Sequence, residues 1–169
     1  MLRILPQDYL TAKRLKLASL GFVYPATMVA EARKTGLPLY EAAALLKMET
    51  GGGRNVYGHD KVRNPIGQGA VVTPENYKQY LDYRNRGLGN QGVGPCQLTS
   101  TSLQTAADRE GGCDKPWINM RVGFRFLNGL KKVHGVPQAY RAYNGSGPAA
   151  DTYMHHFQNY VNTFREKFK

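Results

Sequence analysis

Glycine and proline divide this chain into short segments, and that division restricts the folds open to it. The 169 residues include 19 Gly and 9 Pro, and between them the apolar residues recur at helical rather than alternating spacing. Glycine readily ends a helix and proline readily starts one, so each break predicts a helix boundary. The helices expected from this pattern span residues 7–20, 25–36, 38–50, 74–86, 99–110, 116–134, 137–143 and 150–167.

Two polar, glycine-bearing stretches interrupt these helices. Residues 51–73 lack periodicity and are expected to form either a long loop or a small hairpin, with residues 55–60 and 69–72 as its short strands. Residues 87–95 read GLGNQGVGP and form a second glycine-rich loop. Both stretches would lie between helices, where loops commonly carry functional residues.

The chain as a whole is expected to form one domain. It is 41% hydrophobic and 21% charged, as in an ordinary globular protein. We find no internal repeat and no linker, so we predict a single mainly α-helical domain over residues 1–169, with N-terminal helices of residues 1–35 packed on a core of residues 36–169. No stretch approaches the roughly 18 apolar residues of a membrane span. The first residues carry charges inside every apolar run, unlike a secretory signal peptide.

The charge of the chain predicts a polyanionic partner. Lys and Arg number 23 against 12 Asp and Glu, for a net charge of +11. Nucleic acid, an anionic membrane and a bacterial cell wall all fit such a surface, and solubility alone is the simpler alternative. No helix-turn-helix or zinc-finger spacing is present, so the charge does not select nucleic acid.

Glu49 stands apart among the 12 carboxylates. Most of the others, including Glu31 and Glu41, have basic or polar neighbours on a helix and are expected on solvated faces. Glu49 instead lies in the last turn of its helix, where the dipole disfavours a negative charge and raises the pKa of a carboxyl. It also borders the apolar face, because Ala42 lies about two turns earlier. A half-buried acid of this kind suits a general acid, whereas the structural alternative is a frayed, exposed glutamate.

Three segments stand in order around this acid: ALLKMETGG at 44–52, GVGPCQLT at 92–99 and AYRAYNGSGPAADTY at 139–153. In this order the chain resembles the lytic transglycosylases and goose-type lysozymes, which cleave the glycan of bacterial peptidoglycan. The resemblance covers roughly residues 36–165. It implies an α+β, lysozyme-like fold that needs no cofactor. The layout is most similar to small phage endolysins consisting of this domain alone.

The resemblance also assigns roles to individual residues. Glu49 matches the family's catalytic acid, which protonates the bond between N-acetylmuramic acid and N-acetylglucosamine. A protein of this kind would act as a monomer on peptidoglycan and its anionic polymers, without inserting into a membrane. It would be made in the host cytoplasm and reach the wall after release, or be carried by a virion. The substrate-binding residues implied in the same way are Gly94, Gln97, Tyr143 and Asn144.

The resemblance leaves two chemical routes open. Asp60, in a glycine-bearing loop after Glu49, resembles a goose-type acid that positions water, and its alternative role is that of a turn residue. A second goose-type acid is replaced here by Thr99. With Glu49 alone, the muramyl C6 hydroxyl closes an anhydro ring; with Asp60 holding a water, the bond is hydrolysed. The missing second acid favours the first route.

The remaining signals are weaker. Trp117 is expected in the core. Adjacent residues on a helix point about 100° apart, so His155 and His156 cannot chelate a metal together, and we expect no metal site. Cys96 and Cys113 are expected as two buried thiols, although one disulfide would also fit.

The rival functional class is a non-catalytic basic module that binds cell wall or nucleic acid, in which Glu49 would be structural.

Overall fold

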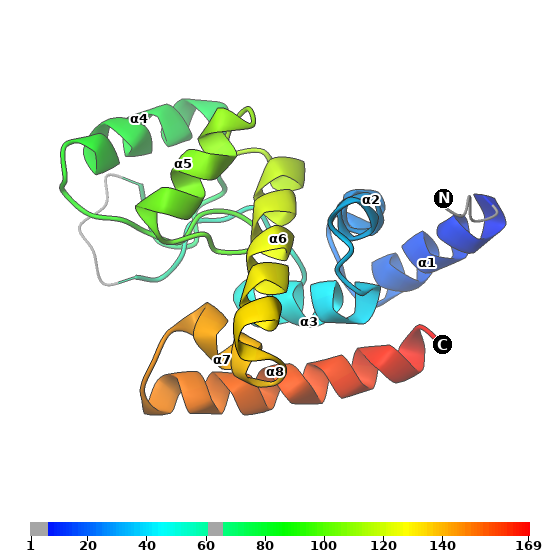
Figure 1. Cartoon of the computed structure of the whole chain (residues 1–169). Helices are drawn as coiled ribbons and strands as arrows, with labels where there is room; N and C mark the ends of the chain where they lie inside the picture. The colour runs from blue at the N-terminus through cyan, green and yellow to red at the C-terminus, as the bar shows by residue number, and fades with distance from the viewer. Residues whose placement is uncertain (1–6, 61–65) are drawn as a thin grey trace.

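The structure, a computed structural model, describes residues 7–60 and 66–169 and is mainly α-helical, as expected (Figure 1). The first six residues of the expected N-terminal region, and residues 61–65 of the expected loop, lie outside the described residues. The eight helices of the described part are α1 (Gln7–Ser19), α2 (Pro25–Thr35), α3 (Leu39–Thr50), α4 (Pro74–Asn85), α5 (Thr101–Arg109), α6 (Pro116–His134), α7 (Gln138–Asn144) and α8 (Pro148–Lys167).

The helix ends follow the glycine and proline pattern closely. Gly51 ends α3 in the left-handed conformation, with φ of 67°, which glycine adopts without steric cost. At the start of α4, the Thr73 side chain accepts from the backbone of Asn76, and the Asn76 side chain accepts from the backbone of Thr73. This reciprocal cap, followed by Pro74, fixes where α4 begins.

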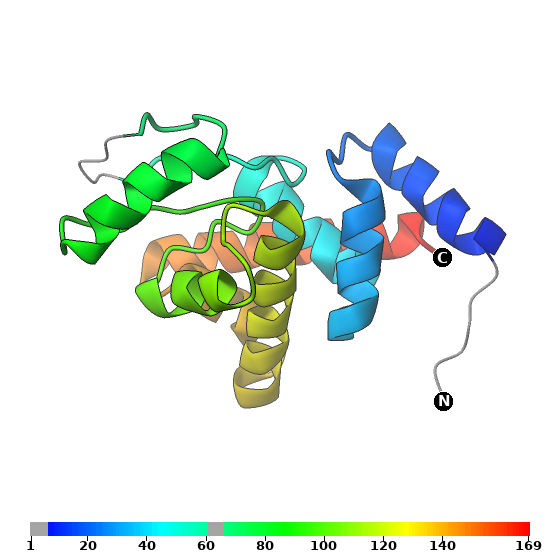
Figure 2. The ribbon, with the colours of Figure 1, turned by 90° about the horizontal axis from the view of Figure 1, so that it is seen from above.

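Helix α3 is the centre of the molecule. Its residues Ala42–Leu46 are all buried, and the helix packs along α8. Helix α6 packs against α2 and α7, and α1 packs on α2. Helix α1 also contacts the C-terminal end of α8, where Lys13 Nζ donates to the carbonyl of Phe168. Figure 2 shows α4 and α5 on the opposite side of α6 from α1 and α2. Of the two helices in the described N-terminal region, α2 packs on both α3 and α6.

The segment after α3 lies between the two expected alternatives: residues 55–57 pair with residues 69–72 around an isolated bridge of Val56 with Val71, and the described residues form no strand there. The backbone N–H of Tyr57 donates to Ala70 at 2.9 Å, and that of Val72 donates to Asn55 at 2.9 Å. Tyr57 also forms an antiparallel bridge with Val93, which in turn bridges Leu98. This small pairing brings the two glycine-rich loops together beside the end of α3.

Trp117 does not lie in the core. Its side chain is 46% exposed, at the second position of α6. Ile118 and Asn119 of the same turn are buried, so the turn itself is covered and Trp117 lies on its outer side; the prediction was wrong. None of the helices in the described part combines the length and apolarity that a bilayer crossing requires.

Glu31 and Glu41 are buried, contrary to expectation. Glu31 accepts from Arg121 Nε at 2.8 Å and pairs with Lys34 Nζ at 2.9 Å. Burial alone raises the pKa of Glu31, but the hydrogen bonds and charges of Arg121 and Lys34 outweigh it, so this pKa is lowered. Glu41 pairs with Lys131 from α6. Partners 90 residues away in sequence hold both acids inside the protein.

Candidate active site

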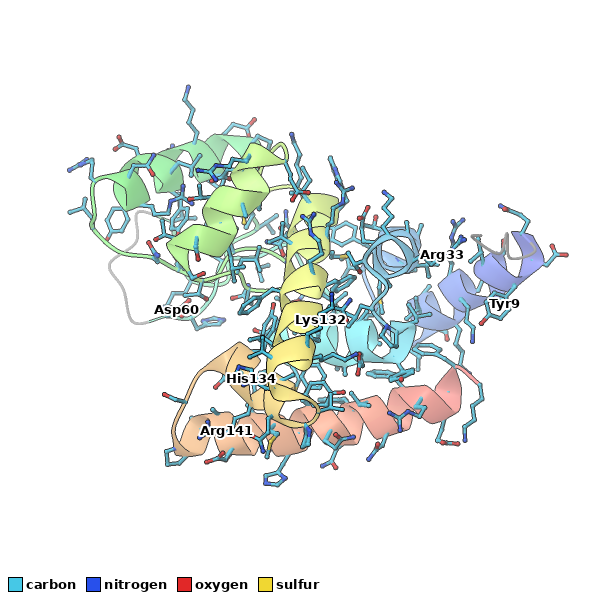
Figure 3. The ribbon with its side chains drawn as sticks, viewed as in Figure 1. Tyr9, Arg33, Asp60, Lys132, His134 and Arg141 are labelled. Atoms are coloured by element: carbon cyan, nitrogen blue, oxygen red, sulfur yellow. The ribbon has the colours of Figure 1, made fainter. Side chains whose placement is uncertain are left out.

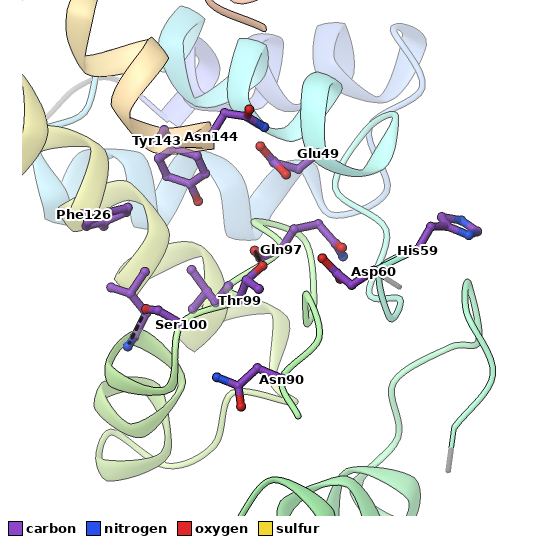
Figure 4. A pocket seen from close by; sticks show the side chains of 12 residues that line it. Glu49, His59, Asp60, Asn90, Gln97, Thr99, Ser100, Phe126, Tyr143 and Asn144 are labelled. Carbon is purple, nitrogen blue, oxygen red and sulfur yellow. Dashed lines mark hydrogen bonds between the residues drawn. The ribbon is translucent and has the colours of Figure 1, made fainter. Parts of the chain in front are cut away.

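A cleft of about 630 Å³ opens between α3, α7 and the two loops (Figure 4). This volume lies within the range of roughly 300–1,000 Å³ that is common for ligand sites. Five of the six predicted site residues line it; the sixth, Gly94, does not. Its lining consists of Glu49, His59, Asp60, Asn90, Gln97, Leu98, Thr99, Ser100, Leu103, Phe126, Tyr143 and Asn144.

Glu49 reaches the cleft from the last turn of α3 and is half-buried. Its Oε1 accepts a hydrogen bond of 2.5 Å from the hydroxyl of Tyr153, on α8. No lysine or arginine forms a salt bridge with it among the residues that the structure describes. The acid is therefore held in place by a neutral donor, without a compensating cation.

These surroundings raise the pKa of Glu49 to about 7. Burial is the largest cause because it disfavours the charged carboxylate. The hydrogen bond from Tyr153 acts in the opposite direction, and the negative charge of Asp60 raises the pKa further. A carboxyl with this pKa exchanges a proton readily near neutral pH, as a group acting as both acid and base must.

Tyr153 is a site residue that sequence reasoning missed. It occupies the inward face of α8 with Phe157, and their rings lie 5.9 Å apart. The signal that could have identified it was its place on this face of α8, which packs on α3. A tyrosine among inward-facing aromatic residues has a hydroxyl that needs a hydrogen-bond partner. Burial and the neighbouring Glu49 raise the pKa of Tyr153 well above its ordinary value, so it remains a donor.

The loop that forms the cleft wall is fixed from three sides. The hydroxyl of Thr50, next to Glu49, donates to the carbonyl of Pro95 at 3.0 Å. The hydroxyl of Tyr143 donates to the carbonyl of Cys96 at 2.9 Å, and the N–H of Cys96 donates to Asn119 Oδ1 at 2.9 Å. These bonds connect α3, α6 and α7 to one short loop, so the wall is rigidly placed relative to the acid.

Gln97 projects into the cleft from an unusual backbone position. Its φ is 47°, in the left-handed region that residues other than glycine rarely adopt. Its side-chain amide donates to the carbonyls of Val56 at 2.9 Å and Gly94 at 3.0 Å. Both amide hydrogens are therefore used within the fold, and the side-chain oxygen lies close to Gly58 and Gly92, where a Cβ would stand 2.5 Å and 2.4 Å from it.

Gly94 lies behind the wall rather than on its surface. A Cβ at this position would stand 2.4 Å from Asn119 Nδ2, which itself donates to the carbonyl of Val93 at 2.8 Å. Gly94 therefore permits the close packing of the loop on α6. Gln97, in the same predicted segment, lines the cleft, whereas Gly94, for which the resemblance implied a substrate contact, does not.

Asp60 lines the same cleft as Glu49 (Figure 4). Its Oδ2 accepts from the backbone N–H of Gly92 at 2.8 Å, and its own carbonyl accepts from Gln68 Nε2 at 2.9 Å. Thr99, which replaces the second goose-type acid, also lines the cleft. Its hydroxyl donates to the carbonyl of Gln97 at 3.1 Å. One carboxylate is thus available to orient a water beside Glu49.

The aromatic side of the cleft is formed by Tyr143 and Phe126, whose ring centroids lie 5.4 Å apart. Asn144, the last residue of α7, is exposed at the rim. The Tyr143 hydroxyl is committed to the loop, so its ring is the part that faces a ligand. Aromatic faces beside polar groups are suited to sugar rings, which have both apolar faces and hydroxyl edges.

The remaining predicted residues lie as follows. His59 lines the cleft, whereas His155 and His156 are exposed on α8. Within residues 7–60 and 66–169, no group of three or more His, Cys, Asp or Glu is arranged to hold a metal ion. Cys96 and Cys113 are buried free thiols, which confirms the first of the two expected alternatives.

No protein-family model, no curated protein and no solved structure matches this chain. The functional argument therefore depends on the geometry of the cleft and on the chemistry of the residues that line it.

Proposed function

We propose that this protein cleaves the glycan strands of peptidoglycan, as a small bacteriolytic enzyme of the lytic transglycosylase or goose-type lysozyme kind, with Glu49 as general acid and base. The observation that carries the proposal is the Glu49 carboxyl itself. It lies in a cleft of suitable size, has a pKa raised to about 7, and lacks a salt-bridge cation among the described residues. The bond cleaved is the β-1,4 bond between N-acetylmuramic acid and N-acetylglucosamine.

In the first step, protonated Glu49 donates its proton to the oxygen of this bond. Positive charge then develops at the anomeric carbon of the muramyl sugar, and the substrate's own N-acetyl group stabilises it. The Tyr153 hydroxyl donates to Oε1 of Glu49, so it fixes the carboxyl and stabilises the carboxylate left after proton transfer. Glu49 next accepts the proton of the muramyl C6 hydroxyl, whose oxygen attacks the anomeric carbon and closes a 1,6-anhydro ring.

Asp60 favours a second route, hydrolysis, as the alternative candidate. Ordinary glycosidases use two carboxylates, one of which activates water. Asp60 is anchored through one oxygen on Gly92 and lines the cleft. Its other oxygen accepts no hydrogen bond from the described residues, so in this route it holds the water. In this route the water takes the place of the C6 hydroxyl, and the product has an ordinary reducing end.

The net charge of +11 supports the same substrate. Peptidoglycan carries peptide carboxylates, and many walls also carry phosphate polymers. A basic surface would hold the enzyme on such a polyanion, and salt would screen this attraction. We therefore expect wall lysis to weaken as ionic strength rises, and equal lysis at low and high salt would contradict this part of the proposal.

The Glu49→Gln variant tests the proposal directly. It keeps the shape of the side chain and removes the proton donor, so we expect clearing of purified cell walls to fall by about a hundredfold or more, with binding to the walls retained. Glu75→Gln is the matched control, because Glu75 is exposed on α4 outside the cleft. Full clearing by Glu49→Gln would exclude Glu49 as the proton donor, and a wild-type protein that binds the walls without clearing them would be better described as a non-catalytic wall-binding module.

The products distinguish the two routes. Anhydro and hydrolysed muropeptides differ in mass by one water, so mass spectrometry of wild-type digests identifies the route. Asp60→Asn should retain ring closure but lose hydrolysis. An Asp60→Asn variant that still releases ordinary reducing ends at the wild-type rate would exclude a role for Asp60 in activating water.

A further inference from the structure

A second hollow, of about 440 Å³, lies at the opposite end of α3 from Glu49. We call it the α1 pocket, because α1 forms one wall and the end of α2, the start of α3 and Phe168 form the others. A helix rises about 1.5 Å per residue, so about 15 Å of α3 separates Leu39, which lines this pocket, from Glu49. Figure 3 shows Tyr9 of the α1 pocket and Asp60 of the cleft at opposite sides of the molecule. The α1 pocket is therefore separate from the proposed active site.

The floor of the α1 pocket is apolar. Val29 and Leu37 line it and are themselves buried. The aromatic residues that also line it are Tyr9, Tyr40 and Phe168. Tyr9 is 47% exposed, and the other two rings are partly exposed, so part of this apolar surface faces solvent. An apolar hollow bordered by aromatic rings suits an acyl chain whose polar end remains outside.

Cations border this apolar surface. Lys13 and Arg33 line the pocket together with the apolar residues. Lys13 Nζ lies over the Tyr9 ring, 5.1 Å from its centre. The guanidinium carbon of Arg165 lies over the Tyr40 ring, 4.8 Å from its centre. These contacts hold positive charge against the aromatic rings of the pocket.

The positive charge is not compensated locally. Among the described residues that line the α1 pocket, none is acidic, and Lys13, Arg33 and Arg165 form no salt bridge within the described part of the chain. Lys16, which is exposed, lies three residues after Lys13 and seven after Tyr9, on the same side of α1. The positive charge therefore extends beyond the pocket, over a wider surface than a single anionic group covers.

We infer that the α1 pocket docks this protein peripherally on an anionic phospholipid bilayer, a role that goes beyond the proposed function and does not depend on it. One acyl chain enters the pocket, and the phosphate of the same lipid lies against Lys13 and Arg33. Lys16 and Arg165 face the head groups of neighbouring lipids. Nucleic acid would satisfy the cations but offers no chain for the apolar floor. A single free amphiphile would fill the pocket but leave the outer cations without a partner.

Vesicle sedimentation tests this inference with two kinds of vesicle, phosphatidylcholine alone and an equal mixture of phosphatidylcholine and phosphatidylglycerol. We expect the wild type to bind the mixed vesicles and not the neutral ones. Each basic residue lost beside an anionic membrane weakens binding about fivefold, so the double variant Lys13→Gln with Arg33→Gln should bind about twenty-five-fold more weakly. Arg33 is exposed, so Arg33→Gln alone should fold normally and lose about fivefold.

Tyr9→Ser tests the apolar part of the pocket. It removes a ring from the lining without changing the net charge, and binding to mixed vesicles should weaken about tenfold, as expected for the loss of a partly buried aromatic side chain. The matched control for charge is Lys78→Gln with Arg109→Gln, which removes two exposed cations from α4 and α5. Both helices lie on the opposite side of α6 from α1 (Figure 2). This control should bind mixed vesicles as the wild type does, because salt screens charges that lie far from the contact.

Several outcomes would overturn the inference. They are equal binding to both kinds of vesicle, binding to neither, and an equal loss in the control and in the variant of Lys13 and Arg33. Unchanged binding by Tyr9→Ser would also overturn it, because charge alone would then explain the attraction. Tighter binding to a DNA duplex than to mixed vesicles would overturn it in favour of nucleic acid. A dimer in light scattering that Tyr9→Ser dissociates would overturn it in favour of self-association. The proposed function is tested separately, by the clearing of purified cell walls.

Discussion

Helix α3 carries two glutamates whose surroundings differ in one respect. Glu41, in its first turn, accepts a hydrogen bond of 2.7 Å from the hydroxyl of Tyr140 and pairs with Lys131. Glu49, in its last turn, accepts from the hydroxyl of Tyr153 but has no salt-bridge partner within the described residues. Each glutamate therefore accepts a hydrogen bond from a tyrosine, but only Glu41 forms a salt bridge with a lysine.

Under the proposed function, this difference separates a structural acid from a reactive one. A buried carboxylate is tolerated when a nearby cation compensates its charge. Without such a cation, the carboxyl retains its proton to higher pH, as the pKa of about 7 for Glu49 shows. The tyrosine hydrogen bond orients either acid, but only Glu41 has a lysine that compensates its charge.

The largest expected effect is on stability. Glu41→Gln leaves Lys131 without its partner and should lower the free energy of unfolding by about 3 kcal/mol. Glu49→Gln removes a poorly compensated acid and should not lower it. Urea unfolding at pH 7 measures both variants, and a double variant with Glu41→Leu and Lys131→Met should recover much of the loss. A larger loss in Glu49→Gln than in Glu41→Gln would contradict the comparison.

The second expected effect is on the pH dependence of stability. The pKa of Glu49 is about 7 in the folded protein and 4.5 as its ordinary value, so between these values the folded state binds more protons than the unfolded state. Stability should therefore fall as pH rises through this window, by about 2 kcal/mol, less than the full value for such a shift because Glu49 is half-buried. The difference in unfolding free energy between the wild type and Glu49→Gln, followed from pH 4 to 8, isolates this contribution. A constant difference would show that the acid is not perturbed.

The smallest expected effect is a displacement of the pH–activity profile. If protonated Glu49 donates the proton, kcat/KM should fall as pH rises through about 7. Tyr153→Phe removes the hydrogen bond that lowers the pKa of Glu49, so this limb should move to higher pH. Asp60→Asn removes the charge that raises the pKa, so the limb should move to lower pH. If the falling limbs of the two variants' pH–activity profiles moved in the same direction, these two contacts could not be the cause.

The helices of this fold could be predicted because their boundaries are encoded locally. Gly36 and Gly51 end α2 and α3 in the left-handed conformation, and the cap at Thr73 begins α4. Such signals need no knowledge of distant residues. The position of Glu49 at the end of α3 was predictable for the same reason, and so was its unfavourable location relative to the helix dipole.

The contacts between distant segments could not be predicted in this way. Glu31 and Glu41 were expected in solvent because their helical neighbours looked sufficient, whereas Arg121 and Lys131, each 90 residues further on, are the groups that bury them. Tyr153 was missed for a related reason. Its role depends on how α8 lies against α3, and the sequence shows only that both helices have an apolar face.

The bond between Glu49 and Tyr153 joins residues separated by 104 positions in the chain. The donor lies on the last helix, which also packs along most of α3. A nascent chain from which α8 has not yet emerged therefore has neither the cover that desolvates its acid nor the hydroxyl that orients it. Under the proposed function, a chain that lacks α8 would therefore be inert rather than weakly lytic.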